Sequence, residues 1–229
     1  AYVVQQGDKQ YLVYDGKKSE GYDEVLEYNL TFSPDSRHFV YIANLNGKYY
    51  VIYDGKKSEG FNGLIYNWAT DLRSNLVFSP DSKHFAYFVW ENDKYYLIYD
   101  GEKSDGYDYI SEWGNFDFSP DSQHFAYVVQ QGDKQYLVYD GKKSEGYDDV
   151  PSFTFSPDSQ HLAYWAKQNN KYYVIYDGKK SEGYDDVPSF TFSPDSQHLA
   201  YWAKQNNKYY VIYDGKKSEG YDDVPSFTF

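Results

Sequence analysis

Phe153-Thr-Phe-Ser-Pro-Asp-Ser-Gln-His161 is an apolar stretch that runs into a proline turn. Close variants of it end at four other histidines, His38, His84, His124 and His198. In each copy the His is followed by Phe or Leu, then Ala or Val, then Tyr. Such self-similarity at a regular spacing identifies a repeat protein, so the repeat is the unit whose fold has to be predicted.

A second marker of the repeat is the Asp-Gly pair, which occurs six times, at Asp15, Asp54, Asp100, Asp140, Asp177 and Asp214. Alternation and turn residues predict four strands in residues 151–187, namely 152–155, 161–167, 172–176 and 181–184. Asp177-Gly178 is a strong signal for a tight hairpin between the third and fourth strands. The fourth strand is polar, which is typical of an exposed sheet edge.

Both faces of the predicted second strand are apolar, with Tyr164 on one side and Ala163 and Trp165 on the other. A sheet packed between two neighbours needs this pattern. Four short strands per repeat are typical of a β-propeller with one blade per repeat. We therefore predict an all-β, single-domain, six-bladed propeller of four-stranded antiparallel blades. The blades would comprise residues 226–229 with 1–25, then 28–64, 75–110, 115–150, 151–187 and 188–224.

The phrase Phe-Ser-Pro-Asp-Ser, followed by His, an apolar residue, Ala or Val, and Tyr, resembles the TolB-type, WD40-like propeller repeat. In that family a Phe-Ser-Pro-Asp-Gly turn precedes an apolar strand. The resemblance covers essentially the whole chain and implies a propeller used as a binding scaffold, without implying a ligand. This chain departs from the family at one turn position, where Ser stands in place of the commoner Gly, at Ser36, Ser82, Ser122, Ser159 and Ser196.

Five proline turns accompany six Asp-Gly hairpins, so one blade is divided between the ends of the chain. Phe229 matches Phe192 and Ala1 matches Ala200, which leaves a seven-residue turn missing between them. We predict that Ser226 to Phe229 forms the innermost strand of the blade whose other strands lie in residues 1–22, closing the ring. The same strand could instead be donated to a second molecule, although we favour a monomer.

The repeats are unusually alike. Residues 1–25 recur as 126–150 with one difference, Glu24 against Asp149, and residues 151–187 are identical to 188–224. Independent divergence would have scattered surface changes that cost little stability. Very recent duplication or deliberate construction is required, and we favour construction.

Composition restricts the partners. The formal net charge of -13, with no local cluster of Lys and Arg, disfavours nucleic acid. No apolar run approaches the length of a membrane span, so no membrane partner is predicted. The absence of Cys excludes disulfides and cysteine-based metal sites, and the absence of Met is compatible with an extracytoplasmic origin or an edited sequence. The compartment stays open.

The chemically reactive residues follow the repeat, which argues against catalysis. All five His occupy one position, and we predict that they stabilise the turn by bonding a neighbouring Ser or Asp. No catalytic residue, metal ligand or cofactor is predicted. We interpret the acidic links as a solvated, turn-favouring surface, and two alternatives remain for them, a cation site or a glycosidase pair. These links contain Asp23 and Glu24, Asp148 and Asp149, Asp185 and Asp186, and Asp222 and Asp223.

Aromatic residues in the irregular links are the candidate ligand site. Trp165 and Trp202 lie on repeated strands and are expected in the core. Residues 22–29, 61–75 and 107–115 break the repeat and would present rings on one face, as binding loops on rigid scaffolds do. An alternative is that these links fold back with their rings buried. The candidate residues are Tyr28, Tyr66, Trp68, Asp71, Arg73, Trp90, Tyr109, Glu112 and Trp113.

These features predict a non-catalytic propeller scaffold with no assigned native ligand. The alternative is a module that binds protein or peptide through the aromatic links. A glycosidase or a propeller that gates a peptidase is a third, less favoured class.

Overall fold

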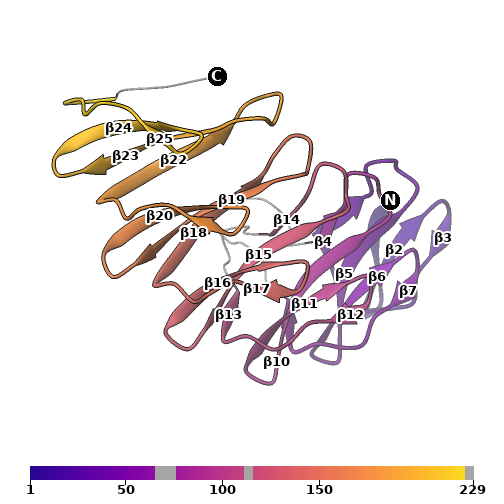
Figure 1. The fold of residues 1–229 in the computed structure, drawn as a ribbon. Helices are drawn as coiled ribbons and strands as arrows, with labels where there is room; N and C mark the ends of the chain where they lie inside the picture. Colours follow the sequence, from indigo (N-terminus) through magenta and orange to yellow (C-terminus); the bar gives the residue numbers. More distant parts are fainter. Residues whose placement is uncertain (65–75, 111–115, 225–229) are drawn as a thin grey trace. The chain divides into compact units, whose positions relative to one another are not determined.

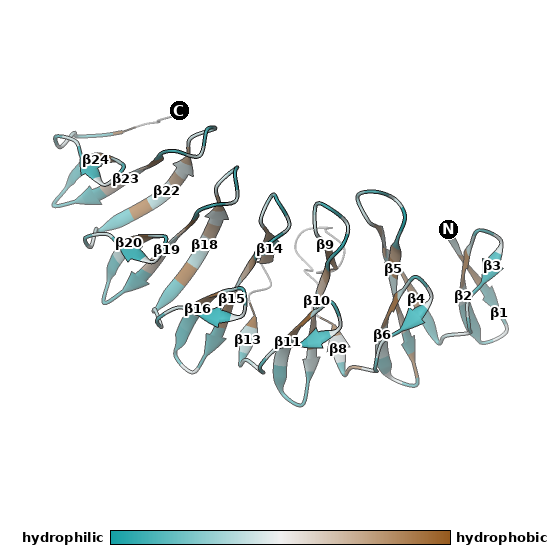
Figure 2. Cartoon of the chain, turned by 45° about the vertical axis from the view of Figure 1, so that its right-hand side comes forward, coloured by the Kyte–Doolittle hydropathy of each residue, from teal (hydrophilic) through white to brown (hydrophobic). Residues whose placement is uncertain are grey.

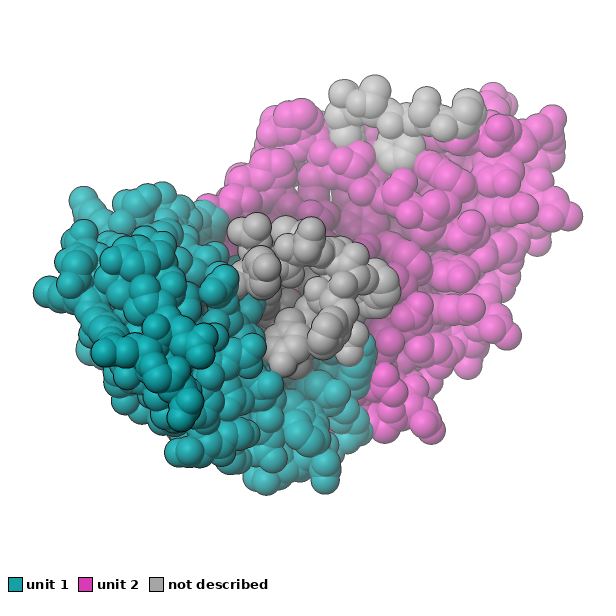
Figure 3. Space-filling model, turned by 180° about the vertical axis from the view of Figure 1, so that it is seen from behind, with its two compact units in different colours: residues 1–114 teal, residues 115–229 magenta. Residues whose placement is uncertain are grey.

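The structure is a computed structural model that describes residues 1–64, 76–110 and 116–224, apart from the side chain of Tyr28. The chain divides into two compact units, Ala1–Gly114 and Asn115–Phe229 (Figure 1, Figure 3). All regular structure in the described ranges is β-strand (Figure 1). No helix in these ranges is long and apolar enough to cross a membrane.

Unit 1 contains three antiparallel sheets. The first has three strands, β1 (Tyr2–Gln6), β2 (Lys9–Tyr14) and β3 (Lys17–Lys18). The second has the order β4 (Glu24–Phe32), β5 (Phe39–Leu45), β6 (Lys48–Tyr53) and β7 (Lys56–Lys57). In the third, β8 (Gly63–Leu64) and β9 (Val77–Phe78) both pair with β10 (Phe85–Glu91), which is followed by β11 (Lys94–Tyr99) and β12 (Glu102–Lys103). The last described strand of the unit is β13 (Tyr109–Ile110).

Unit 2 repeats the same order three times. Its first sheet contains β14 (Phe116–Phe118), β15 (Phe125–Gln131), β16 (Lys134–Tyr139) and β17 (Lys142–Lys143). The next contains β18 (Asp149–Phe155), β19 (Leu162–Gln168), β20 (Lys171–Tyr176) and β21 (Lys179–Lys180). The last contains β22 (Asp186–Phe192), β23 (Leu199–Gln205), β24 (Lys208–Tyr213) and β25 (Lys216–Lys217).

The structure confirms an all-β chain with several four-stranded antiparallel sheets, since three of the described sheets have four strands. The Asp-Gly hairpin is confirmed too, because Asp177 and Gly178 have φ of 45° and 75°, as a type I′ turn requires. No sheet among the described residues closes on itself, and the number of blades and the closure of the ring stay predictions. The predicted closing strand, Ser226 to Phe229, lies outside the described residues, and the single-domain organisation stays a prediction.

The predicted fourth strand at 181–184 is wrong in its position. β21 comprises only Lys179 and Lys180, because the Ser181 hydroxyl takes the place of the next backbone acceptor and bonds the Val174 N–H at 3.0 Å. The chain returns to the sheet at Tyr184, which pairs with Tyr172. Gly183 lets the chain pass close to Tyr173, since a Cβ at this position would lie 3.1 Å from that ring, which is a tight contact.

The proline turn is a closed hydrogen-bonded unit. The Ser156 hydroxyl donates to Asp158 Oδ1 at 2.6 Å and accepts from the His161 N–H at 3.0 Å. Asp158 Oδ1 also accepts from the Gln160 N–H at 3.1 Å. These bonds, led by the one from Ser156, lower the pKa of Asp158 below its ordinary value.

Ser at the usual glycine position of this turn has a function of its own. Ser159 adopts φ of 66°, a left-handed conformation that costs a non-glycine residue some strain. Its hydroxyl accepts a 2.9 Å bond from the Asp121 N–H of the preceding repeat, and Ser196 does the same for Asp158. The substitution therefore adds a hydrogen bond between neighbouring sheets that glycine could not make.

The core lies between the sheets. In unit 2, Ala163, Val174 and Tyr184 of one sheet form a buried cluster with Phe192 and Tyr201 of the next. Figure 2 shows brown, apolar residues along strands such as β5, whereas β3 at the outer edge is teal. Each sheet thus buries apolar side chains against its neighbour, as the sequence pattern predicted.

We expect stability to fall as the pH drops below about 4, the ordinary pKa of an unfolded Asp. The turn carboxylates have lowered pKa values in the folded chain, so their contribution is present above that pH and lost below it. Urea unfolding at a series of pH values measures this. Asp158→Asn should make the free energy of unfolding fall less steeply with decreasing pH. An unchanged pH dependence would contradict the role of the turn carboxylates.

Candidate functional site

Each His is held by an aspartate and a tyrosine of its own repeat. His161 Nδ1 lies 2.7 Å from Asp177 Oδ2, and its ring centroid lies 5.4 Å from that of Tyr176. Asp177 Oδ1 accepts from the Leu162 N–H at 3.1 Å. The same bonds recur at His38, His84, His124 and His198. The prediction of a structural His is supported, although its side-chain partner is the Asp of the hairpin rather than a residue of the proline turn.

In three of the four acidic links, the first acid joins two repeats. Asp148 Oδ1 accepts from Lys134 Nζ at 2.6 Å, and its Oδ2 accepts from the Asn169 N–H of the next repeat at 2.8 Å. These bonds, that of Lys134 foremost, lower the pKa of Asp148. Asp23 and Asp185 make the equivalent contacts.

Asp149, the second acid of the link that begins with Asp148, has a different environment. Burial raises the pKa of Asp149 above its ordinary value, and Asp149 lies opposite Lys167 in the sheet register. Neighbouring acids with pKa values shifted in opposite directions are a feature of some acid–base pairs. Among the residues that the structure describes, no group of three His, Asp or Glu is placed to hold a metal ion.

A Glu–Tyr–Lys cluster joins the outer parts of neighbouring sheets. The Tyr147 hydroxyl donates to Glu145 Oε1 at 2.6 Å, and Lys180 Nζ of the next repeat lies 3.0 Å from the same oxygen. Lys180 Nζ also lies over the rings of Tyr147 and Tyr173, at 4.8 and 4.4 Å from their centroids. Burial, together with the bond to Glu145, raises the pKa of Tyr147 far above its ordinary value.

This cluster differs at one junction of unit 1. There Phe61 replaces the Tyr, and Glu59 lies 3.8 Å from Lys103. The ring packing survives, because Phe61 lies edge-on to Tyr87 with centroids 6.2 Å apart, against 6.1 Å for Tyr147 and Tyr164.

The structure brings two of the nine predicted aromatic-site residues near one another. Trp90 on β10 is half-buried, lies against Gly63 and pairs with Tyr95 across the sheet. Tyr109 on β13 is half-buried as well, and its ring is T-shaped to that of Tyr95 at 5.6 Å. The other seven lie outside the described residues or, for Tyr28, have an undescribed side chain: Tyr28, Tyr66, Trp68, Asp71, Arg73, Glu112 and Trp113. The aromatic site therefore stays a prediction.

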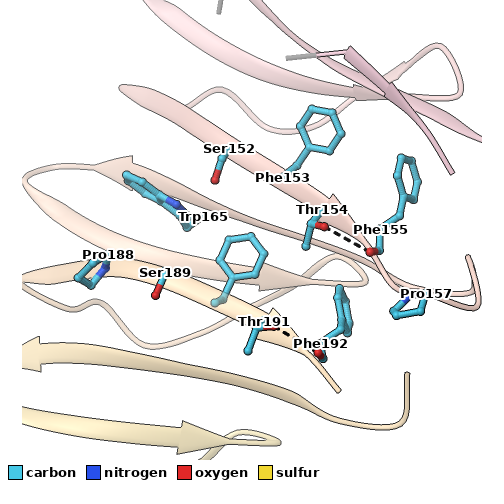
Figure 4. A pocket seen from close by; sticks show the side chains of 11 residues that line it. Ser152, Phe153, Thr154, Phe155, Pro157, Trp165, Pro188, Ser189, Thr191 and Phe192 are labelled. Atoms are coloured by element: carbon cyan, nitrogen blue, oxygen red, sulfur yellow. Dashed lines mark hydrogen bonds between the residues drawn. The ribbon is translucent and has the colours of Figure 1, made fainter. Parts of the chain in front are cut away.

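A cavity that the sequence did not predict lies between the inner strands β18 and β22 of unit 2 (Figure 4). It has a volume of about 360 Å³. Trp165, expected in the core, is only half-buried and lines this cavity with Ser152, Thr154 and Phe192. The sequence signal that could have indicated this cavity is Trp165 itself, because the preceding repeat has the smaller Val128 at the same position.

A groove of about 360 Å³ also runs beside β1 in unit 1. Val3, Leu12, Val25, Leu26 and Tyr41 are among the residues that line it. In the described residues β1 pairs only with β2, whereas its sequence equivalent β15 pairs with both β14 and β16. The groove therefore lies at the sheet edge where the repeat pattern places one further strand.

No protein-family profile matches the sequence, and no curated protein matches it. Among solved structures, the chain is similar to TolB from Acinetobacter baumannii, with 16% identity, a TM-score of 0.40 and coverage of 93% of this chain. The chain spans 61% of the length of that protein. A putative TolB from Agrobacterium tumefaciens shows 16% identity and a TM-score of 0.39, covering 89% of this chain and 83% of its own. The Cps50 (Swd1) β-propeller domain of Myceliophteria thermophila shows 9% identity and a TM-score of 0.37, covering 97% of this chain and 89% of its own. All three similar structures cover most of this chain, at TM-scores of 0.40 or below.

Proposed function

We propose that this chain is a non-catalytic scaffold, a six-bladed propeller whose repeats are joined by one recurring set of bonds. The observation that carries the proposal is the uniform use of its reactive groups. The His imidazole and the Ser hydroxyl of the proline turn make the same structural bonds in each of the five described copies. A catalytic site would combine unlike residues at one place.

Closure of the ring by the chain's own ends is supported by a comparison of its junctions. At four described junctions an aromatic ring of one repeat is 1–2% exposed and packs on a Tyr of the next that is 3–8% exposed. The equivalent rings at the two ends are Tyr221, which is 41% exposed, and Tyr2, which is 62% exposed. Asp222 has a side chain that is 94% exposed, against 40% for Asp185. The two ends thus carry the two halves of a junction that the chain forms elsewhere.

The groove beside β1 has the position that the closing strand needs. Residues 223–229 repeat the sequence of β18 and β22, Asp-Val-Pro-Ser-Phe-Thr-Phe. In β18, Phe153 pairs with Tyr164 and Thr154 pairs with Ala163. The same register would place Phe227 opposite Tyr2 and Thr228 opposite Ala1. We propose closure within one chain, giving a monomer of near-identical blades, which recent duplication or construction would have produced.

A second proposed role is binding of a protein or peptide at the aromatic links. The half-buried rings of Trp90 and Tyr109 beside Tyr95 favour it. Alanine at Trp90 should then weaken capture of a partner without unfolding the chain.

Tyr147→Phe should destabilise the chain by about 1–2 kcal/mol, because it removes a hydrogen bond to a carboxylate and keeps the ring. Tyr221→Phe should cost a similar amount if the ring is closed, since Tyr221 would then occupy the same environment. Chemical unfolding of both variants measures this. A Tyr221→Phe chain as stable as the parent would count against closure. Tyr147→Phe is the control, because it measures the loss of stability at a junction that is already formed.

Deletion of residues 226–229 should lower the melting temperature and promote association through the uncovered edge of β1. Thermal unfolding and light scattering report the two effects. Replacing Phe227 and Phe229 by Ser keeps the chain length and serves as the matched variant. A truncated chain that stays monomeric with an unchanged melting temperature refutes closure.

The absence of catalysis is tested by assaying the chain against panels of chromogenic glycosides and peptides, beside Asp149→Asn. We expect no turnover by either protein. Turnover that Asp149→Asn abolishes would instead identify an enzyme, with the acidic link as its site.

A further inference from the structure

The cavity between β18 and β22 has two walls of different chemistry. Ser152 and Thr154 lie opposite Trp165 and Ala163 in the sheet register, so they share the face turned toward the next repeat. Figure 4 shows Ser152 and Thr154 pointing away from Phe153 and Phe155, toward the side of β22. The opposite wall contains the rings of Phe190 and Phe192, which pack in the same cluster as Trp165.

The indole gives this cavity its aromatic platform. Trp165 packs against Tyr172 of the same sheet, with ring centroids 5.5 Å apart and ring planes tilted by 57°. In the preceding sheet of unit 2 the equivalent residue is Val128, which is 2% exposed. The position can therefore hold a small, buried side chain. Because the larger ring of Trp165 is only half-buried there, part of its aromatic surface is available to a ligand.

The hydroxyl groups have hydrogen-bonding capacity left over. Thr154 Oγ1 donates to the Phe155 carbonyl at 3.3 Å, a long bond that leaves its lone pairs to accept. Within the described part of the chain no hydrogen bond is recorded for the Ser152 hydroxyl. A purely apolar ligand would bury both hydroxyls without a partner, which is costly.

The absence of charge in the cavity lining excludes ionised ligands. None of the eleven residues that line the cavity is charged. An ionised group placed between Trp165 and Phe190 would lose its hydration without gaining a counter-ion. The ligand that fits is neutral, with an apolar ring face for the aromatic walls and hydroxyls at its rim for Ser152 and Thr154.

We propose that this cavity is a binding site for a neutral carbohydrate, one or two pyranose rings in size. Pyranoses combine a face of C–H groups with a rim of hydroxyls, which matches the two walls. The volume of about 360 Å³ is at the lower end of the range of small-molecule sites, about 300–1,000 Å³. The site is separate from the aromatic links and does not depend on closure of the ring.

Fluorine NMR of the full chain labelled with 5-fluorotryptophan tests the site directly. The five Trp give five resonances, which single Trp→Val variants assign. Maltose, cellobiose and diacetylchitobiose are the probes, with glucuronic acid as the charged comparator. We expect at least one neutral sugar to shift the Trp165 resonance saturably, while the Trp90 resonance in unit 1 does not move.

A Ser152→Ala, Thr154→Val double variant separates binding from general stability, because both substitutions keep the shape of the strand. Loss of two hydrogen bonds should weaken the sugar by about tenfold or more. The proposal is overturned if no neutral sugar shifts the Trp165 resonance, if the double variant binds equally well, or if glucuronic acid binds as tightly. A shift produced only by a proline-rich peptide would overturn it too.

Discussion

Burial of both faces of a sheet, seen at β19, is the constraint on which the structure depends. Tyr164 on one face of β19 belongs to the cluster shared with the preceding sheet, and Ala163 on the other face belongs to the cluster shared with the following one. A two-layer protein could leave one face of such a sheet in water, but here neither face is polar. Every repeat therefore needs a neighbour on each side, and the fold can only be stable as a continuous series.

Polar groups then fix the spacing that the apolar contacts leave adjustable. Three bonds recur from one repeat to the next at different distances from the core: Ser159 with Asp121, Asp148 with Asn169, and Glu145 with Lys180. Two of these contacts are hydrogen bonds from backbone N–H groups and the third is an exposed ion pair, and each adds little stability singly. Their repetition in register along the strands instead specifies how each sheet is rotated against the next, which packing of aliphatic side chains alone does not fix.

Much of the fold could be predicted from the sequence because each strand and turn recurs in several repeats, so that one copy checks the interpretation of another. Asp177-Gly178 determines a hairpin by backbone conformation alone, and alternation in residues 161–167 determines which side chains face which neighbour. The fourth strand could not be placed, because the Ser181 hydroxyl replaces a backbone acceptor and no periodicity reports that. The His partner was also missed, since Asp177 lies sixteen residues beyond His161 and meets it only after the hairpin folds.

The candidate sites show the opposite limit. Trp165 follows the strand pattern, and pattern alone assigns it to the core, yet its exposure depends on the size of the residues facing it across the junction. Ser152 and Thr154 are too small to cover an indole, whereas the equivalent Val128 needs no such cover. Two repeats can therefore share one backbone and one hydrogen-bond set and still differ in whether a cavity exists between them. Function in a chain of near-identical units is then to be sought where a side chain differs between repeats, as Trp165 differs from Val128, because the scaffold around it is already fixed by its neighbours.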